Sequence, residues 1–261
     1  MRVSRMNCAP MSEHVTEDAF LGGRLLLRQP KSGHRAGHDA MLLAAATRAR
    51  QGDRVADLGA GVGAAGLALA KRVAGIDLVL VEIDPQLAAL ARANAAANAI
   101  AADVIVLDVE SPAEAFAAAG LPPDSVDVVL MNPPFNDSRR HRASPDPARE
   151  VAHIASATTL QGWIHAARRI LKSGGELTLI WRADGIAEVL AALDRGFGSL
   201  QIMPVHADVT AVAGRILLRA VKGGRAPTRL HAALVLNEES GVPNKQVQES
   251  LMGKGILPLA E

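Results

Sequence analysis

The sequence predicts an α/β domain with a mostly parallel sheet and helices on both faces. From about residue 54, short β-branched runs alternate with alanine-rich stretches of helical length. The short runs are apolar at every position, which is typical of strands buried on both faces between two layers of helices. The alternation of the two kinds of segment favours parallel strands joined by crossover helices.

Each expected strand is identified by its run of apolar residues. The runs predicted to be parallel strands are Val55–Leu58, Leu78–Ile83, Val104–Val109, Val126–Met131 and Leu177–Trp181. Between them, Leu87–Ala97 and Leu160–Leu171 are predicted to be helices. The glycine pair 174–175 is expected to end the second of these helices.

The pattern changes after residue 200. Leu200–Val205 and Arg215–Val221 are strand-like, and no long helical run lies between them. We therefore expect an antiparallel pair at this end of the sheet. The polar, glycine-punctuated tail at 237–261 is expected to be only partly ordered.

Composition restricts the class of protein and its compartment. The 261 residues are 49% hydrophobic and 21% charged, an ordinary globular balance, and the net charge of +1 gives no bulk signal for a polyanion partner. The single cysteine, Cys8, allows no disulfide within the chain, which fits a reducing compartment. No signal peptide and no membrane span are evident, so we expect a cytoplasmic protein, with Met11 as an alternative start.

The first chemical motif is Asp57-Leu-Gly-Ala-Gly-Val-Gly63, directly after the first strand. Its glycines, Gly59, Gly61 and Gly63, permit a tight strand-to-helix turn and a close approach of the backbone to a ligand. The segment from Gly61 to Gly66 also matches the G-x-G-x-x-G pattern of dinucleotide-binding proteins. A nicotinamide or flavin enzyme therefore remains an alternative here, as does a glycine-rich turn without a ligand.

Acidic residues are expected at the ends of the next two strands, Glu82 after the second and Asp108 after the third. Open α/β sheets bind ligands beyond the carboxyl ends of their strands, so Glu82 is predicted to hold a ribose and Asp108 an adenine amino group. The four positions from Asp57 to Asn132 are spaced 24 to 26 residues apart, about one strand-helix unit each. Helix caps or solvated loops are the alternative. Asp84-Pro85 has the pattern of a helix cap, which favours Glu82 for the ribose.

The motif Asn132-Pro133-Pro134-Phe135 stands where the fourth strand should end. The prolines stiffen the backbone and lack N–H donors, which leaves carbonyl oxygens available as hydrogen-bond acceptors. Together with the Asn132 carboxamide, they can hold the hydrogens of a planar amino group while Phe135 stacks on its ring. A nitrogen held in this way is suited to attack a sulfonium methyl group, whereas a dehydrogenase has no use for the arrangement. A proline-stiffened strand end is the alternative without function.

The glycine motif and Asn-Pro-Pro-Phe together resemble the class I S-adenosylmethionine-dependent methyltransferases of amino groups. Those enzymes modify adenine N6 in DNA or RNA, or the side-chain amide of glutamine in release factors. The stretches Leu21–Pro30 and Gly33–Leu43, with Gly37 to Ala40 opening a helix, are similar to the bacterial tRNA(Val) (adenine-N6)-methyltransferases. The resemblance covers about residues 16–225. It implies a Rossmann-like, mostly parallel seven-stranded sheet with an antiparallel strand near the C-terminus.

The resemblance also implies a cofactor and roles for the site residues. S-adenosylmethionine is the expected cofactor, with Asp57 and the glycines at its methionine part, Glu82 at its ribose and Asp108 at its adenine. Asp39 is expected to cap the first helix of an N-terminal lid and to close over the cofactor. Asn132 and the Pro133 carbonyl are expected to bind the target amino group. The implied domains are an extension and lid at 1–50, the methyltransferase domain at 51–235 and a tail at 236–261.

Charge favours an RNA partner for this expected enzyme. Arg139, Arg140 and Arg142 leave the catalytic strand directly after its motif, and basic groups that border an active site suit a phosphate backbone. Together with this charge, the resemblance to the tRNA enzymes implies adenine N6 in RNA as the target, with tRNA as the RNA. A solvated surface is the simpler interpretation of any single arginine. The loop at 139–142 is favoured because it follows the catalytic strand, and the basic segment Arg215–Arg229 is the second choice for RNA contacts.

Three other functions remain open. A protein glutamine N5-methyltransferase would use the same Asn-Pro-Pro motif, but it would be expected to carry a helical recognition domain ahead of the core. An NAD-dependent oxidoreductase fits the glycines and leaves Asn132–Phe135 unexplained, and a non-catalytic module would lose the acceptors. No metal is expected, because no cysteine-histidine cluster has ligand spacing. Trp163 and Trp181 are predicted to belong to the core.

Overall fold

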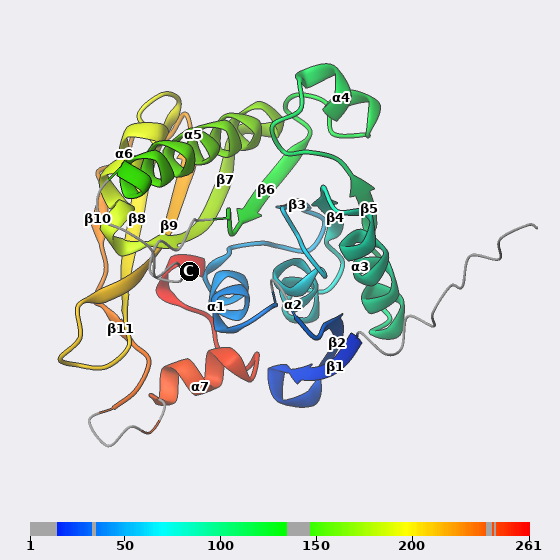
Figure 1. Cartoon of the computed structure of the whole chain (residues 1–261), viewed down its shortest axis with the longest axis horizontal. Helices are drawn as coiled ribbons and strands as arrows, with labels where there is room; N and C mark the ends of the chain where they lie inside the picture. The colour runs from blue at the N-terminus through cyan, green and yellow to red at the C-terminus, as the bar shows by residue number, and fades with distance from the viewer. Residues whose placement is uncertain (1–14, 33–34, 135–146, 239–241, 243) are drawn as a thin grey trace, which may run out of the picture.

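A central sheet lies between two layers of helices in the computed structural model, which describes residues 15–32, 35–134, 147–238, 242 and 244–261 (Figure 1). In the described part of the chain this sheet has nine strands, in the order β10-β8-β9-β7-β6-β3-β4-β5, with β11 also paired to β8. Their bounds are β3 (Arg54–Leu58), β4 (Asp77–Glu82), β5 (Asp103–Val106), β6 (Val126–Met131), β7 (Leu171–Arg182), β8 (Phe197–His206), β9 (Ala213–Lys222), β10 (Arg229–Leu230) and β11 (Leu234–Val235).

The sheet is parallel where the sequence predicts parallel strands. β3 pairs in parallel with β4 and β6, β4 with β5, and β6 with β7. β9 runs antiparallel to both β7 and β8, which confirms the pair predicted after residue 200. The seven strands from β3 to β9 match the expected sheet, and β10 and β11 extend it beyond β8. The carboxyl ends of the parallel strands therefore meet at one edge, where ligands of open α/β sheets bind.

Several predicted boundaries are wrong, and the helix predicted to start at Leu160 starts at Pro147. The helix expected to end at the glycine pair 174–175 ends at Ile170, and the pair lies inside β7. The pairing of β7 with β6 shifts register at this point, so the additional residues form an irregularity in the strand instead of a helix end. β5 ends at Val106, three residues before the predicted Val109, so Asp108 lies in the loop beyond the strand.

The helices bury two separate core clusters, one on each face of the sheet. The helices are α1 (His38–Ala46), α2 (Ala64–Arg72), α3 (Pro85–Ala97), α4 (Ala113–Ala118), α5 (Pro147–Ile170), α6 (Ile186–Leu193) and α7 (Lys245–Leu251). Apolar residues of α1, α2 and α3 form the first cluster, and those of α4, α5 and α6 form the second. Trp163 and Trp181 are buried in the second cluster, which confirms that they belong to the core.

The N-terminal segment predicted to be a lid contains a hairpin that the sequence pattern did not reveal. β1 (Val15–Phe20) and β2 (Leu25–Pro30) pair with each other as a separate antiparallel sheet. β2 packs against α3, and its buried leucines, Leu25 and Leu27, belong to the first core cluster. The hairpin is therefore part of the folded body on the α3 side of the sheet (Figure 1).

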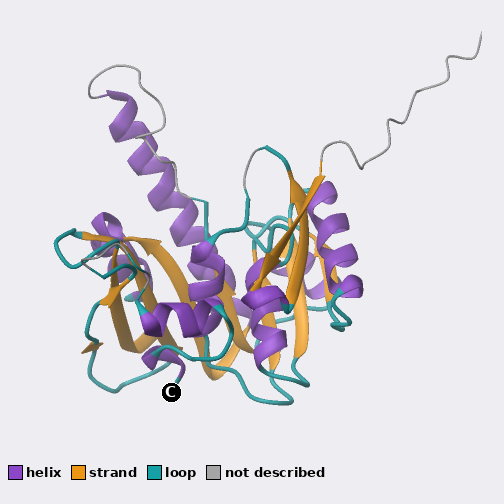
Figure 2. Ribbon diagram, turned by 90° about the horizontal axis from the view of Figure 1, so that it is seen from below, coloured by secondary structure: helices purple, strands orange, loops and turns teal. Residues whose placement is uncertain are grey.

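The C-terminal tail packs more extensively than expected in its described residues. Val247 of α7, together with Leu257 and Leu259 near the chain end, is buried in the first core cluster. The Leu257 N–H donates a hydrogen bond to the Ala45 carbonyl of α1 at 3.0 Å. α7 lies below α1, while the N-terminal half of α5 projects beyond the sheet (Figures 1 and 2). Within the described ranges no helix has both the length and the apolar character needed to cross a bilayer.

Candidate functional site

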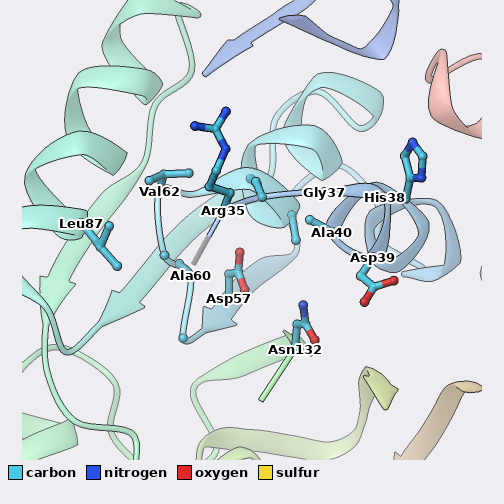
Figure 3. A pocket seen from close by; sticks show the side chains of 15 residues that line it. Arg35, Gly37, His38, Asp39, Ala40, Asp57, Ala60, Val62, Leu87 and Asn132 are labelled. Carbon is cyan, nitrogen blue, oxygen red and sulfur yellow. The ribbon is translucent and has the colours of Figure 1, made fainter. Parts of the chain in front are cut away.

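A cavity of about 290 Å³ opens at the carboxyl edge of β3 and β6 (Figure 3). Its lining comes from the start of α1, the loop after β3, the first turn of α2, one side chain of α3 and the residue after β6. The lining residues are Arg35, Ala36, Gly37, His38, Asp39, Ala40, Asp57, Gly59, Ala60, Gly61, Val62, Ala64, Ala65, Leu87 and Asn132. Of the residues predicted for the site, Asp39, Asp57, Gly59, Gly61 and Asn132 are therefore brought together around one space.

The loop from Gly59 to Gly63 is held on β4 by its own backbone. The N–H groups of Gly59 and Ala60 both donate to the Val81 carbonyl at 2.9 Å. Gly59 has a φ of 72°, and a Cβ added there would lie 2.2 Å from the Trp163 ring of α5. Glycine is needed at this position both for the left-handed backbone and for the close approach of the indole. The loop is thus fixed between β4 and α5 before any ligand binds.

Asp57 is a buried carboxylate that points into the cavity (Figure 3). Its side chain belongs to the end of β3, and its Oδ2 accepts a hydrogen bond from the Gly66 N–H of α2 at 2.8 Å. Asp57 is 2% exposed. Burial is the main reason that its pKa rises from 3.8 to about 7; the Gly66 hydrogen bond opposes this rise and the charge of Glu82 adds to it. A carboxyl group with this pKa responds to a cation that enters the cavity.

Glu82 lies at the end of β4, where it supports the glycine loop. Its Oε2 accepts from the Gly61 N–H at 2.7 Å and its Oε1 from the Asp84 N–H at 2.9 Å. It is 6% exposed and is absent from the lining of the cavity described above. Asp84 caps α3 by accepting from the Gln86 and Leu87 N–H groups, with Pro85 in the first turn, as predicted.

Asp108 and Gly63 lie outside the cavity lining. Asp108 is exposed in the loop after β5, and its Oδ1 accepts a hydrogen bond from the Glu110 N–H at 2.9 Å. Gly63 has a φ of 87° and precedes α2 at its N-cap. These contacts leave the predicted adenine and methionine roles of the two residues as proposals.

Asn132 follows β6 and lines the cavity opposite the glycine loop (Figure 3). Its Oδ1 is buried and has no hydrogen-bond partner among the described residues. Buried acceptors are nearly always paired in folded proteins, so an unpaired one at a cavity wall marks a contact for a ligand. Pro133 is buried and Pro134 is exposed. Phe135 and the arginines of the predicted RNA contact, Arg139, Arg140 and Arg142, lie outside the described residues.

The prediction that Asp39 caps α1 is wrong. The N-cap is Gly37, which makes no side-chain capping bond, and Asp39 belongs to the first turn of the helix. Its Oδ2 accepts instead from Arg215 Nε of β9 at 3.1 Å, and the two side chains are about one-third exposed, at 33% and 34%. A carboxylate in a first turn already suits the positive end of the helix without a capping bond. Asp39 still lines the cavity, so a cofactor contact remains a proposal for it.

Several residues of the site were not singled out from the sequence. Arg35 lines the cavity, and its guanidinium donates to Asp18 at 2.7 Å and to the Pro30 carbonyl at 2.7 Å. Ile83, the residue after Glu82, is 59% exposed. Ile83 lies just beyond β4 and is not part of the cavity lining. The sequence gives no local signal for Arg35, because its partners, Asp18 and the Pro30 carbonyl, are brought to it by the folded hairpin.

No group of three or more potential metal ligands is present within the ranges that the structure describes.

Comparison with known proteins assigns a family to the described fold. The family model for the methyltransferase small domain matches residues 36–208. The chain is 31% identical over 163 residues to the ribosomal RNA small subunit methyltransferase C of Sodalis glossinidius, which covers 62% of this chain and 39% of that protein. It is 30% identical over 176 residues to the tRNA1(Val) (adenine(37)-N6)-methyltransferase of Porphyromonas gingivalis, which covers 66% of this chain and 68% of that protein.

Solved structures agree with the sequence relatives. A predicted O-methyltransferase from Agrobacterium tumefaciens has a TM-score of 0.70 and 34% identity, over 84% of this chain and 98% of that one. The T. thermophilus 16S rRNA N2 G1207 methyltransferase, solved with AdoMet and guanosine, has a TM-score of 0.54 and 22% identity, over 80% of this chain and 50% of that one; at this identity it shows the fold alone. The structural matches confirm the predicted Rossmann-like class I methyltransferase fold. Membership of the methyltransferase small domain family confirms S-adenosylmethionine as the cofactor.

Proposed function

The chain belongs to the methyltransferase small domain family, and from this membership we propose that it transfers a methyl group from S-adenosylmethionine to N6 of an adenine in RNA, with tRNA as the RNA. The observation that carries the proposal is the buried, unpartnered Oδ1 of Asn132 at the wall of the cavity. We place the activity in the cytoplasm, where the tRNA pool is found.

The residues around the cavity fit the chemical groups of the cofactor. The Asp57 carboxylate suits the ammonium group of a methionine moiety, because burial makes an opposite charge favourable there. Glu82 suits a ribose: each of its oxygens has a second lone pair beyond the one used by the backbone N–H, so it can accept a hydroxyl as well. The exposed Ile83 can cover one face of the adenine, and Asp108 and Asp39 are assigned its amino group and the closing contact. When bound, the cofactor supplies an electrophilic methyl group on a sulfonium.

The acceptors after β6 favour an amino nitrogen as the target. Asn132 Oδ1 and the Pro133 carbonyl can each accept one N–H of an amino group, and this pair of bonds localises the lone pair on its nitrogen. A hydroxyl has only one hydrogen to donate, so it would leave one of the two acceptors unpaired. Catalysis then rests on alignment and on preorganised acceptors rather than on a strong base. Phe135 is assigned the stacking contact with the ring.

An RNA substrate is supported by the names of two relatives and by charge. The Porphyromonas protein is named for adenine N6 in tRNA and the Sodalis protein for ribosomal RNA. The chain spans 39% of the length of the latter, so the activity of that whole protein is not transferred here. An adenine in a stacked RNA must be turned out to reach a cavity of this kind. We assign the phosphate contacts to Arg139, Arg140 and Arg142.

A protein glutamine remains the second candidate, because its amide presents the same two hydrogens to the Asn132 acceptor. The release factor glutamine methyltransferase of Chlorobaculum tepidum is 25% identical to this chain over 192 residues. The two candidates share the site chemistry and differ in the macromolecule that carries the amide or amine.

Labelled methyl transfer separates these candidates. Total tRNA, ribosomal RNA and a protein fraction with release factors are incubated with the enzyme and methyl-labelled S-adenosylmethionine, and the RNA is digested to nucleosides. We expect label in N6-methyladenosine from tRNA, and none when Asn132→Ala replaces the parent. Label in the glutamine of a release factor, in N2-methylguanosine or in a 2′-O-methyl nucleoside would reject the adenine proposal.

Changing Arg139, Arg140 and Arg142 to Ala should weaken RNA binding and flatten its salt dependence, while cofactor affinity stays unchanged.

A further inference from the structure

Asn94 in the last turn of α3 and Asn98 at its C-cap bind the free edge of the N-terminal hairpin as a third strand would. Asn98 accepts from the Leu26 N–H at 3.0 Å and donates to the Leu26 carbonyl at 2.7 Å. Asn94 accepts from the Arg28 N–H at 2.8 Å and donates to the Arg28 carbonyl at 3.0 Å. Each carboxamide thus satisfies both backbone groups of one β2 residue, and the edge of the hairpin is covered.

The spacing of the two asparagines explains why a helix can pair with a strand edge in this way. Residues four apart on a helix lie on one face and are about 6 Å apart along its axis. Residues two apart on a strand point the same backbone edge outward and are about 6.8 Å apart. Asn94 and Asn98 therefore meet Leu26 and Arg28 in register.

Asn94 makes one contact that Asn98 does not. Its Nδ2 also donates to the Val62 carbonyl of the glycine loop at 3.0 Å, whereas the second donor bond of Asn98 goes to the Asn94 carbonyl in its own helix at 2.8 Å. Asn94 is fully buried, at 0% exposure. Val62 lines the cavity, between Gly61 and Gly63.

The glycine loop is consequently held from two sides. Glu82 accepts the Gly61 N–H at 2.7 Å, and Asn94 donates to the Val62 carbonyl, one residue further along the chain, at 3.0 Å. A loop with left-handed glycines has little conformational preference of its own, so these two side chains fix which way its peptide groups face. Of these two side chains, Asn94 also binds β2 of the hairpin.

We propose that Asn94 is a positioning residue for cofactor binding, which joins the N-terminal hairpin to the glycine loop and sets the orientation of the Gly61–Gly63 backbone. The proposal rests on the proposed function for its ligand, S-adenosylmethionine. It also makes the hairpin a fixed part of the cofactor site rather than a lid that opens and closes over it. Asn98 holds the same hairpin without touching the loop, and it is therefore the matched control.

The test compares Asn94→Asp with Asn98→Asp in the full chain. Each substitution keeps an acceptor for the β2 N–H and removes the donor to the β2 carbonyl together with one further donor bond, so the damage to the hairpin is equal. The melting temperature should fall in both, and further in Asn94→Asp because its carboxylate is fully buried. The Kd for S-adenosylhomocysteine, measured by calorimetry, should rise by about tenfold or more in Asn94→Asp and stay within about twofold in Asn98→Asp. Asn94→Ala and Asn98→Ala repeat the comparison without a new charge, in case a buried carboxylate prevents folding.

Hydrogen exchange of the unliganded protein gives a readout that does not depend on the cofactor. The amides of Gly61, Val62 and Gly63 should exchange faster in the Asn94 variants and at the parental rate in the Asn98 variants. Equal losses of cofactor affinity in the two pairs would show that the hairpin as a whole matters and would overturn the role of Asn94. Unchanged exchange in the loop would overturn it as well. Failure of the parent to bind S-adenosylhomocysteine would instead count against the proposed function, and the exchange comparison would still decide on Asn94.

Discussion

The two sides of the cavity differ in how their polar groups are satisfied. On the β3–β4 side, the carboxylates of Asp57 and Glu82 already accept backbone N–H groups. On the β6 side, Asn132 Oδ1 is buried without a partner among the described residues. Polar groups that are hydrogen-bonded within the protein fix the shape of a site, whereas a buried acceptor without a donor can bind a donor of the ligand. The comparison suggests that cofactor contacts are prebuilt and that the contact with the target amino group is completed by the substrate.

The largest effect is expected on the unsatisfied side. Asn132→Ala should lower kcat by about 10²- to 10³-fold, as loss of a preorganised group that acts on the reacting centre does. The Kd for S-adenosylhomocysteine should stay within about twofold, since the carboxamide is assigned to the target nitrogen. Asn132→Asp, which keeps acceptor oxygens, should retain more activity than the alanine variant. A parental kcat combined with weakened cofactor binding in Asn132→Ala would place this residue on the cofactor side and break the distinction.

A smaller effect, of the opposite kind, is expected from Glu82. Glu82→Ala removes the acceptor for the Gly61 and Asp84 N–H groups and, in the proposed role, for the ribose hydroxyls. The KM for S-adenosylmethionine should rise by roughly 10- to 100-fold, because each buried donor left unpaired costs about 1–3 kcal/mol. The kcat at saturating cofactor should change much less. Asp108→Ala is the comparison variant. Among the described residues, the exposed Asp108 carboxylate accepts a hydrogen bond only within its own turn, so a rise in KM of a few fold is expected.

The sequence predicted the strands and the glycine loop on the β3–β4 side of the cavity better than it predicted the side-chain contacts that hold them. Apolar runs located β3 to β9, and the glycine motif placed the loop between Asp57 and Gly63, because both signals are local. The sequence did not predict the hairpin, because β2 starts with three leucines instead of alternating apolar and polar residues. Its outer edge is bound by Asn94 and Asn98, which lie 66 and 72 residues further along the chain. The prediction for Asp39 is wrong for the same reason: its partner, Arg215, is 176 residues away. Helix starts can be predicted from neighbouring residues, but tertiary partners of single polar side chains cannot.

The pH dependence of Asp57 tests how the satisfied side responds to a ligand. Its pKa is about 7 in the folded protein against an ordinary value of 3.8, so between about pH 4 and 7 the folded state holds a proton that the unfolded state has lost. The Asp57 contribution to the free energy of unfolding therefore decreases as pH rises through this window, by up to about 1.4 kcal/mol per unit. Asp57→Asn removes the effect, so its stability relative to the parent should increase from pH 5 to pH 8 in urea unfolding.

Cofactor affinity should show the reverse trend, because an ionised Asp57 attracts the ammonium group of the ligand. In the parent, the affinity for S-adenosylhomocysteine should rise with pH up to about 7 and then level off. In Asp57→Asn the affinity should be lower and should not change over the same range. Equal pH profiles in the two proteins would show that Asp57 does not titrate near the ligand.

The smallest effect is expected at the ion pair between Asp39, which lines the cavity from the first turn of α1, and Arg215 of β9. The pair is about one-third exposed, with 3.1 Å between Arg215 Nε and Asp39 Oδ2, and such pairs contribute only about 0.2–1 kcal/mol to stability. Arg215→Ala should therefore lower the free energy of unfolding by less than about 1 kcal/mol.

If Asp39 contacts the cofactor, releasing it from Arg215 should change the KM for S-adenosylmethionine by about twofold to fivefold, because a difference of about 0.4–1 kcal/mol corresponds to such a ratio. Arg215→Lys keeps the charge and should restore the parental KM in 50 mM salt more fully than in 500 mM salt, since screening weakens an exposed pair. A KM that is identical in the parent and in both variants would show that the pair braces the start of α1 and has no part in holding the ligand.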